Sequence, residues 1–188
     1  MKLEIQTLVG NQQHILSGSA AGRKLLATLI DVTPPGNAPE RLFLDFTGIE
    51  VATTSFLRES VIGFRDFTRS SRQNIYPIVT NARPAVLEEL ELFLQARGDA
   101  LWCCSLNVLD EVSEHRILGN LDPVQHKTFE MVREMGTATA PELAARFPNE
   151  TIGPTAWNNR LSGLAAKGLL VEMRQSKIKA FRPLLGDT

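Results

Sequence analysis

Three consecutive hydroxyl side chains, Thr53, Thr54 and Ser55, stand where an apolar segment gives way to a helical pattern. The segment ahead of them contains a short strand that ends in Asp45, a turn with Gly48 and a second apolar patch. A hydroxyl at the start of a helix can cap it by accepting a hydrogen bond from a backbone N–H. It can also carry a phosphate, because the amino-terminal end of a helix favours negative charge. The run therefore predicts a cap or a phosphorylation site at Thr54 or Ser55, and the frequency of hydroxyl caps favours the cap.

Asp45 is a carboxylate at the end of an otherwise apolar strand. In that position it can accept a hydrogen bond from a backbone N–H of the turn that follows. It can also face a binding partner. The turn contact is the more common arrangement, and Asp45 is kept as a candidate partner-facing residue.

A second group of polar residues lies on a helix predicted over residues 154–168. Trp157, Leu161 and Leu164 fall on one face of this helix, so that face should pack against the rest of its domain. The other side and its flanks carry hydrogen-bonding side chains, namely Thr155, Asn158, Asn159, Arg160 and Ser162. Asparagine can pair with the edge of adenine and arginine with the edge of guanine, so these residue types suit base reading in duplex DNA.

Four basic residues without an intervening acid follow this helix: Arg174, Lys177, Lys179 and Arg182. They fall on a predicted hairpin of residues 169–174 and 177–183. A basic hairpin attracts DNA phosphates, with an affinity that falls as the salt concentration rises. Two alternatives stay open: the lysines can keep a solvated hairpin edge from pairing with another chain, or the hairpin can contact a protein.

Catalysis is not indicated by any motif. The glycines are isolated and form no phosphate-binding loop, and neither Gly-x-Ser-x-Gly nor His-Glu-x-x-His occurs. Glu88, Glu89 and Glu91 lie together on a predicted helix, which is typical of a solvated face. The chain is therefore expected to be non-enzymatic and to use no cofactor.

The histidines and cysteines do not suggest a metal site either. His14, His115 and His126 are scattered, without metal-ligand spacing. Cys103 and Cys104 are adjacent in a predicted strand, where neighbouring side chains point to opposite faces and are poorly placed to bond to each other. They are expected to be buried as small apolar residues, and no metal is expected.

Residues 1–119 show strands that alternate with helices, which predicts an α/β sheet covered by helices. The predicted strands are residues 2–9, 13–16, 42–46, 76–79 and 100–106, with 13–16 pairing with the first. The predicted helices are residues 20–31, 56–68, 84–95 and 109–118.

Residues 122–188 show helical patterns followed by a hairpin, without alternating strands and helices, and form a second predicted domain after a short linker. Asp122 and Pro123 start a helix that stops at Gly136, and Thr139 with Glu142 forms a capping box before a helix over 141–147. The helix over 154–168 and the hairpin complete it. Residues 1–121 carry a net charge of −3, whereas residues 122–188 carry +2.

The order of these C-terminal elements resembles the winged helix-turn-helix family over roughly residues 122–185. A short strand, a helix ending in AARF, a turn and a helix closing in LSGLAAKGLL before a basic hairpin carry the resemblance. It implies three helices and a β-hairpin wing, with the exposed face of the third helix entering the major groove of double-stranded DNA.

The stretch LFLDFTGIEVATTSFLRESVIGF resembles STAS-like domains, which are related to anti-anti-sigma factors. In those factors an ATPase-type kinase phosphorylates a serine at this turn, and that serine matches Ser55. The preceding Asp of the family falls on Thr53 and the following Gly on Phe56. These departures favour a helix cap within a binding scaffold over a phosphorylation switch.

Together these features predict a non-enzymatic regulator that binds DNA, acts as a homodimer and senses a partner through its STAS-like domain. The alternative is a partner-switching module that acts with an ATPase-type kinase and does not bind DNA, and a weaker option is a ligand-responsive sensor. The longest aliphatic runs are far shorter than the ~20 residues that span a bilayer. The amino terminus alternates like a strand and carries Glu4, unlike a signal peptide, so a cytoplasmic protein without membrane contact is expected.

Overall fold

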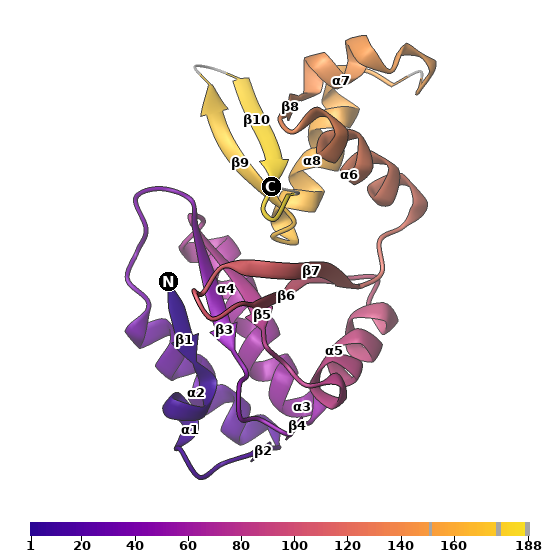
Figure 1. Cartoon of the computed structure of the whole chain (residues 1–188). Helices are drawn as coiled ribbons and strands as arrows, with labels where there is room; N and C mark the ends of the chain where they lie inside the picture. The colour runs from indigo at the N-terminus through magenta and orange to yellow at the C-terminus, as the bar shows by residue number, and fades with distance from the viewer. Residues whose placement is uncertain (151, 176–177, 187–188) are drawn as a thin grey trace. The chain divides into compact units, whose positions relative to one another are not determined.

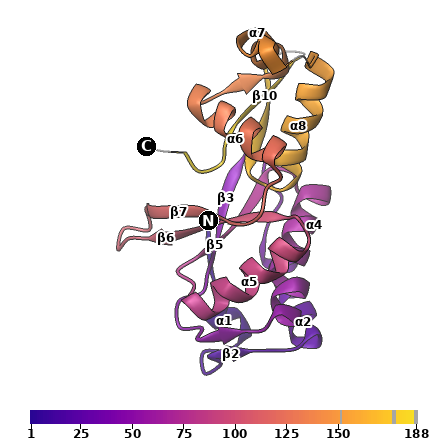
Figure 2. The ribbon, with the colours of Figure 1, turned by 90° about the vertical axis from the view of Figure 1, so that its right-hand side faces the viewer.

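The computed structural model describes residues 1–150, 152–175 and 178–186, and Lys177 of the candidate DNA-binding set lies outside them. The chain divides into two compact units, Met1–Asn120 and Leu121–Thr188 (Figures 1 and 2). Each unit buries its own apolar side chains, so each is described by itself.

A five-stranded sheet organises the first unit, in the order β1-β3-β5-β6-β7. The strands are β1 (Lys2–Glu4), β3 (Glu40–Asp45), β5 (Ile75–Thr80), β6 (Ala100–Leu106) and β7 (Val112–Gly119). The first four are parallel and β7 is antiparallel to β6. Because the parallel strands follow one another in chain order, right-handed crossovers place the connecting helices on one face of the sheet. The predicted α/β class is confirmed here.

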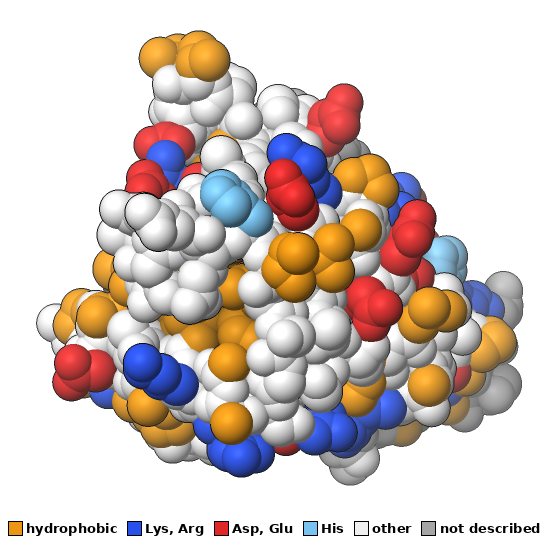
Figure 3. Space-filling model, turned by 90° about the horizontal axis from the view of Figure 1, so that it is seen from below, with side chains coloured by type: hydrophobic (Ala, Val, Ile, Leu, Met, Phe, Trp, Pro, Cys, Tyr) orange, Lys and Arg blue, Asp and Glu red, His pale blue; other side chains and the backbone are white. Residues whose placement is uncertain are grey.

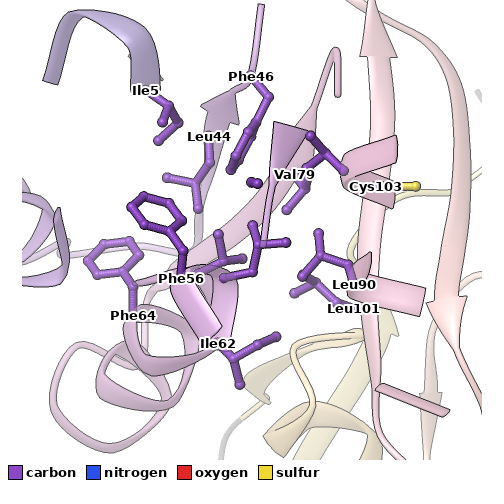
Figure 4. Packing of buried hydrophobic residues seen from close by; sticks show 14 of the residues in the cluster. Ile5, Leu44, Phe46, Phe56, Ile62, Phe64, Val79, Leu90, Leu101 and Cys103 are labelled. Atoms are coloured by element: carbon purple, nitrogen blue, oxygen red, sulfur yellow. The ribbon is translucent and has the colours of Figure 1, made fainter. Parts of the chain in front are cut away.

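The core of this unit lies between that face of the sheet and the helices. The helices are α2 (Ser19–Val32), α4 (Gly63–Ser71) and α5 (Pro84–Ala96). Strand residues such as Leu44, Val79 and Leu101 meet helix residues such as Phe56 and Leu90 in one cluster (Figure 4). All six residues of β5 and the first five of β6 are buried, so both faces of these central strands are shielded from water.

The hydroxyl run opens an unbroken helical segment that is longer than the predicted helix over 56–68. It consists of α3 (Thr54–Leu57), the π-helical turn η1 (Arg58–Ile62) and α4. Within it the buried Ser60 Oγ donates to the Phe56 carbonyl oxygen over 2.8 Å. Helix α2 passes close to its start, because a Cβ built on Gly22 would lie 2.6 Å from that same oxygen. The glycine therefore sets the distance between α2 and α3.

The first predicted strand is wrong beyond Glu4. The chain turns into helix α1 (Ile5–Val9), where Ile5, Leu8 and Val9 share a helical face and Ile5 is fully buried. The segment over 13–16 does not pair with β1. Its strand β2 (Ile15–Leu16) pairs in parallel with β4 (Val51–Ala52) instead.

The helix predicted over 109–118 is also wrong, since these residues form the turn and second strand of a β6–β7 hairpin. Asn107 Oδ1 accepts hydrogen bonds from the backbone N–H groups of Leu109, over 2.8 Å, and Glu111, over 3.0 Å. Leu109 is 73% exposed at the tip, so its apolar character does not mark a core face. The turn that the Asn107 side chain orders therefore determines the structure here, rather than the helical spacing of the apolar residues.

The second unit contains three main helices and a three-stranded antiparallel sheet in the order β8-β10-β9. Its elements are α6 (Pro123–Met135), β8 (Ala138–Thr139), α7 (Ala140–Arg146), the 3₁₀ turn η2 (Pro148–Glu150), α8 (Pro154–Ala166), β9 (Leu170–Gln175) and β10 (Ile178–Pro183). Asp122 Oδ1 accepts from the Gln125 N–H over 2.8 Å. Thr139 and Glu142 form the capping box. Both predicted helix starts are confirmed.

No helix in residues 1–150, 152–175 and 178–186 is long and apolar enough to cross a membrane.

Candidate functional site

Helix α8 of the second unit is amphipathic in an uncommon way, because its solvent-facing stripe bears no charge. Trp157, Leu161 and Leu164 are fully buried. Thr155 and Asn159 are exposed on the opposite side. With the half-buried Ser162 they continue one stripe at i, i+4 and i+7, which places their hydrogen-bonding groups side by side.

Asn158 and Arg160 flank this stripe, as the sequence predicted. Both are half-buried. The guanidinium carbon of Arg160 lies 5.1 Å from the centre of the Trp157 ring, a cation–π distance. Arg160 is therefore held beside the buried face, and the central stripe is uncharged.

The hairpin after α8 brings together two of the predicted basic residues. Lys179 and Arg174 are opposite each other in the β9–β10 register, so their side chains share a face. Lys179 Nζ also lies 2.8 Å from a carboxylate oxygen of Glu172 on β9. The ion pair reduces the positive charge that Lys179 can offer to a phosphate.

Arg182 does not join this basic pair. It pairs with Val171, so its side chain is on the opposite face of the hairpin from Arg174 and Lys179. The register therefore divides the predicted basic residues of the hairpin between its two faces. Lys177 is two residues from Lys179, which predicts the same face of a strand, but Lys177 lies outside the described residues.

Three other basic side chains of this unit are paired with carboxylates. Arg133 is 2.7 Å from Glu130, Arg146 is 3.4 Å from Glu134, and Lys127 pairs with Glu150. In the part of the unit that the structure describes, no carboxylate pairs with Arg174 or Arg182. Arg174 and Arg182 therefore leave positive charge on the hairpin that no carboxylate of the described residues offsets.

In the first unit, the hydroxyl run does not cap its helix. Thr53 occupies the N-cap position, and its side chain makes no capping hydrogen bond. Its Oγ1 instead lies 3.2 Å from Ser55 Oγ and 3.4 Å from the Gly18 nitrogen, which donates to it. The cap predicted at Thr54 or Ser55 is therefore wrong.

Glu89 on α5 accepts the hydrogen bond from the first turn of α3 that a capping side chain would otherwise accept. One of its carboxylate oxygens, Oε2, accepts from the Thr54 backbone N–H over 2.9 Å and also from the Thr54 hydroxyl. A carboxylate at this end of a helix is favoured by the exposed N–H groups and the helix dipole. The sequence assigned Glu89 to a solvated face with Glu88 and Glu91, and this is wrong for Glu89, because a contact between residues 35 apart leaves no local pattern.

Asp45 is 5% exposed and links the carboxyl ends of neighbouring strands. Its Oδ1 accepts from the Thr47 N–H over 2.9 Å and from Asn81 Nδ2 over 3.1 Å. Asn81 Oδ1 in turn accepts from the Leu106 N–H over 2.9 Å. The predicted turn contact of Asp45 is confirmed. Its partner-facing role stays a prediction, and little of the side chain is accessible to a partner.

Cys103 and Cys104 are both free and buried, as predicted. Burial raises the pKa of both thiols, because an apolar environment disfavours the thiolate. The described residues contain no cluster of three or more His, Cys, Asp or Glu side chains suited to hold a metal ion.

The described geometry thus offers two separate candidate sites, the α8 stripe with its basic hairpin and the Thr53–Ser55 run with Glu89. Comparison with protein-family models, curated proteins and solved structures found no match to this chain.

Proposed function

We propose that this protein is a regulator that binds double-stranded DNA through a winged-helix C-terminal unit, while its STAS-like N-terminal unit binds a regulatory partner. The observation that carries the proposal is the uncharged stripe of Thr155, Asn159 and Ser162 on α8, next to a hairpin that bears Arg174 and Lys179. The element order, with a short strand joining the hairpin sheet, supports the winged-helix assignment.

The stripe suits a major groove better than bulk water. A solvated helix usually exposes charged residues, whereas α8 presents amide and hydroxyl groups that can both donate and accept. These groups fit the mixed donors and acceptors on base edges. Gly163 adds room on the same side, because a Cβ there would meet no atom within 4 Å.

The hairpin would supply the contacts to phosphates. Arg174, Lys179 and Arg182 are the described basic residues on its strands, and Lys179 is shared with Glu172. Because Arg182 is on the other face and Lys179 is paired with Glu172, this face would make one to two phosphate contacts, which gives a slope of about −1 to −2 for the logarithm of affinity against the logarithm of salt concentration. The proposal therefore includes modest, salt-sensitive binding rather than tight nonspecific association.

Fluorescence anisotropy of a labelled duplex, chosen by selection from a random library, tests this function. Asn159→Ala should weaken binding to the selected duplex by about tenfold and leave nonspecific binding unchanged, because an asparagine–adenine pair contributes about 1–3 kcal/mol. Arg174→Ala should weaken binding to all duplexes and reduce the salt slope by about one. Arg133→Ala, which removes one charge from α6, is the matched control. Failure of the folded protein to bind any duplex at low salt would contradict the proposal.

A second candidate function is partner switching with an ATPase-type kinase, and the Thr54–Glu89 contact favours it. A phosphate on Ser55 would add negative charge beside a residue that already donates to the Glu89 carboxylate. Repulsion would then loosen α3 from α5. Ser55→Asp should alter the affinity for a co-purified ATPase, and Glu89→Gln should reduce that effect. If no ATPase or other protein co-purifies, this candidate loses its support.

The regulator is further proposed to be a homodimer, with β7 as the contact. β7 is the last strand of its sheet, and no strand in the described residues pairs with its outer edge. Antiparallel pairing of two copies about His115 would place Glu114 of each opposite Arg116 of the other. The sequence of this edge is therefore complementary to itself in charge.

A further inference from the structure

The first unit contains a cavity that none of the functions above uses. It has a volume of about 790 Å³ and lies beside α2, with the chain from Leu8 to Ser17 along its other side. The face of the molecule seen in Figure 3 is hollowed, and hydrophobic side chains line the bottom of the hollow. The volume falls within the range of about 300–1,000 Å³ that is typical of small-molecule sites.

The floor of the cavity is apolar. Leu16, Leu25 and Phe56 line it and are at most 2% exposed, and the half-buried Leu8 and Val9 add further apolar surface. These five residues come from α1, β2, α2 and α3, so the pocket is built by elements that the core already fixes. A hydrocarbon chain or ring would be removed from water on this floor, which favours its binding.

The mouth of the cavity carries positive charge. Lys24 lines it, and no carboxylate in the described part of the chain pairs with its ammonium group. Glu50 is the acidic residue of the lining, and it lies 3.9 Å from Arg83, which offsets its charge. An anionic group at the mouth would therefore meet a lysine rather than an acid.

His14 adds an oriented ring beside this lysine. Its Nδ1 lies 2.8 Å from the carbonyl oxygen of Gly48. The amide nitrogen of Gln6 lies 3.2 Å from the same Nδ1, so two neighbours contact this side of the ring. Gly48 and Gln6 thus hold the imidazole at the cavity, where it lies among the lining residues.

We propose that this cavity binds an amphipathic anion, namely an apolar chain or ring that carries a single carboxylate or phosphate. The apolar part lies against Leu16, Leu25 and Phe56, and the anionic group pairs with Lys24. Phe56 directly follows the Thr53–Ser55 run, so the ligand would contact the start of the helical segment that Glu89 joins to α5. The site is independent of DNA binding.

Isothermal titration calorimetry and thermal unfolding of the full chain test the proposal with three probes, which are decanoate, decyl phosphate and decanol. At least one of the two anions should bind saturably and raise the melting temperature, and their relative affinities distinguish a carboxylate from a phosphate ligand. Decanol should bind at least about tenfold more weakly, because a charge-assisted contact contributes about 1.5–3 kcal/mol. Equal binding of decanol, or no saturable binding of either anion, overturns the proposal.

Two variants and one control locate the site. Lys24→Met keeps the side-chain length and should weaken anion binding by about tenfold, whereas Arg23→Met removes a charge from the neighbouring residue outside the cavity lining and should not. Ala21→Trp should block the cavity without changing the core, since Ala21 is an exposed lining residue. Undiminished anion binding by the folded Ala21→Trp variant would place the ligand elsewhere.

Discussion

The carboxylate of Glu89 joins two helices, because Thr54 donates to it from both its backbone N–H and its hydroxyl. Removal of Glu89 would leave both donors of a half-buried residue without this partner. Glu89→Ala should therefore lower the free energy of unfolding by about 1–3 kcal/mol, as expected for a charged acceptor. Urea titration followed by circular dichroism measures the change. Glu88→Ala, an exposed residue on the same helix, should change it little.

Glu172 competes with DNA for Lys179 if the hairpin contacts phosphates. The carboxylate lies 2.8 Å from the ammonium nitrogen, so Glu172→Gln releases a positive charge without shortening the side chain. Affinity for duplex DNA should rise severalfold at low salt, and the salt slope should steepen by about one. Glu130→Gln, which releases Arg133 on α6, is the matched control. Unchanged affinity in Glu172→Gln would argue that the hairpin meets a protein instead.

The buried thiols of Cys103 and Cys104 make stability fall at alkaline pH. Burial raises the pKa of each above its ordinary value of 9.0, so the folded chain holds these protons more tightly than the unfolded chain does. Their contribution to stability is intact below about pH 8.5–9 and is lost as pH rises through the folded-state pKa. Chemical unfolding at pH 7 to 10.5 should show the decline. The double variant Cys103→Ala, Cys104→Ala should be less stable at pH 7 but decline less steeply.

At the scale of elements, local patterns predicted helices and caps better than they predicted contacts between elements. The capping box of Thr139 and Glu142 needs only residues three apart, and it is present. The partner of Thr54 lies on another helix and could not be predicted from local spacing. Residues 109–118 were predicted as a helix, but the Asn107 side chain orders a turn there and a strand follows it. Of the candidate site, the polar stripe on α8 was predictable from its periodicity, whereas the pairing of Lys179 with Glu172 required the hairpin register.

Two helical glycines allow the packing of elements to be tested directly. Gly22→Ala would place a methyl group 2.6 Å from the Phe56 carbonyl oxygen, which is backbone and cannot move aside easily. The unfolding free energy of the first unit should fall by about 1–3 kcal/mol. Gly163→Ala on α8 meets open space and should stabilise the second unit by up to about 1 kcal/mol. Thermal unfolding compares the two, and an unaffected Gly22→Ala variant would show that α2 and α3 are not so closely packed.

At the scale of the whole molecule, the two units divide the proposed roles. Residues 1–121 carry a net charge of −3 and residues 122–188 carry +2. A negative unit is not suited to DNA, whereas a weakly positive one can bind it when its charges are placed on one element. In the described residues, Arg174 and Arg182 on the hairpin of the second unit have no carboxylate partner, and β7 is one of the two edge strands of the five-stranded sheet in the first unit. Binding of DNA and assembly of copies would therefore use different units.

The proposed dimer gives the sharpest test at this scale, because its contact pairs Glu114 of one copy with Arg116 of the other. Glu114→Arg or Arg116→Glu alone would set like charges opposite each other across the strands, which disfavours pairing. Each single variant should therefore be monomeric by sedimentation velocity. The double variant exchanges the two charges, restores both cross-strand pairs and should dimerise again. A wild-type monomer would show that these charges protect the edge from pairing, and a dimer unaffected by either single change would place the contact elsewhere.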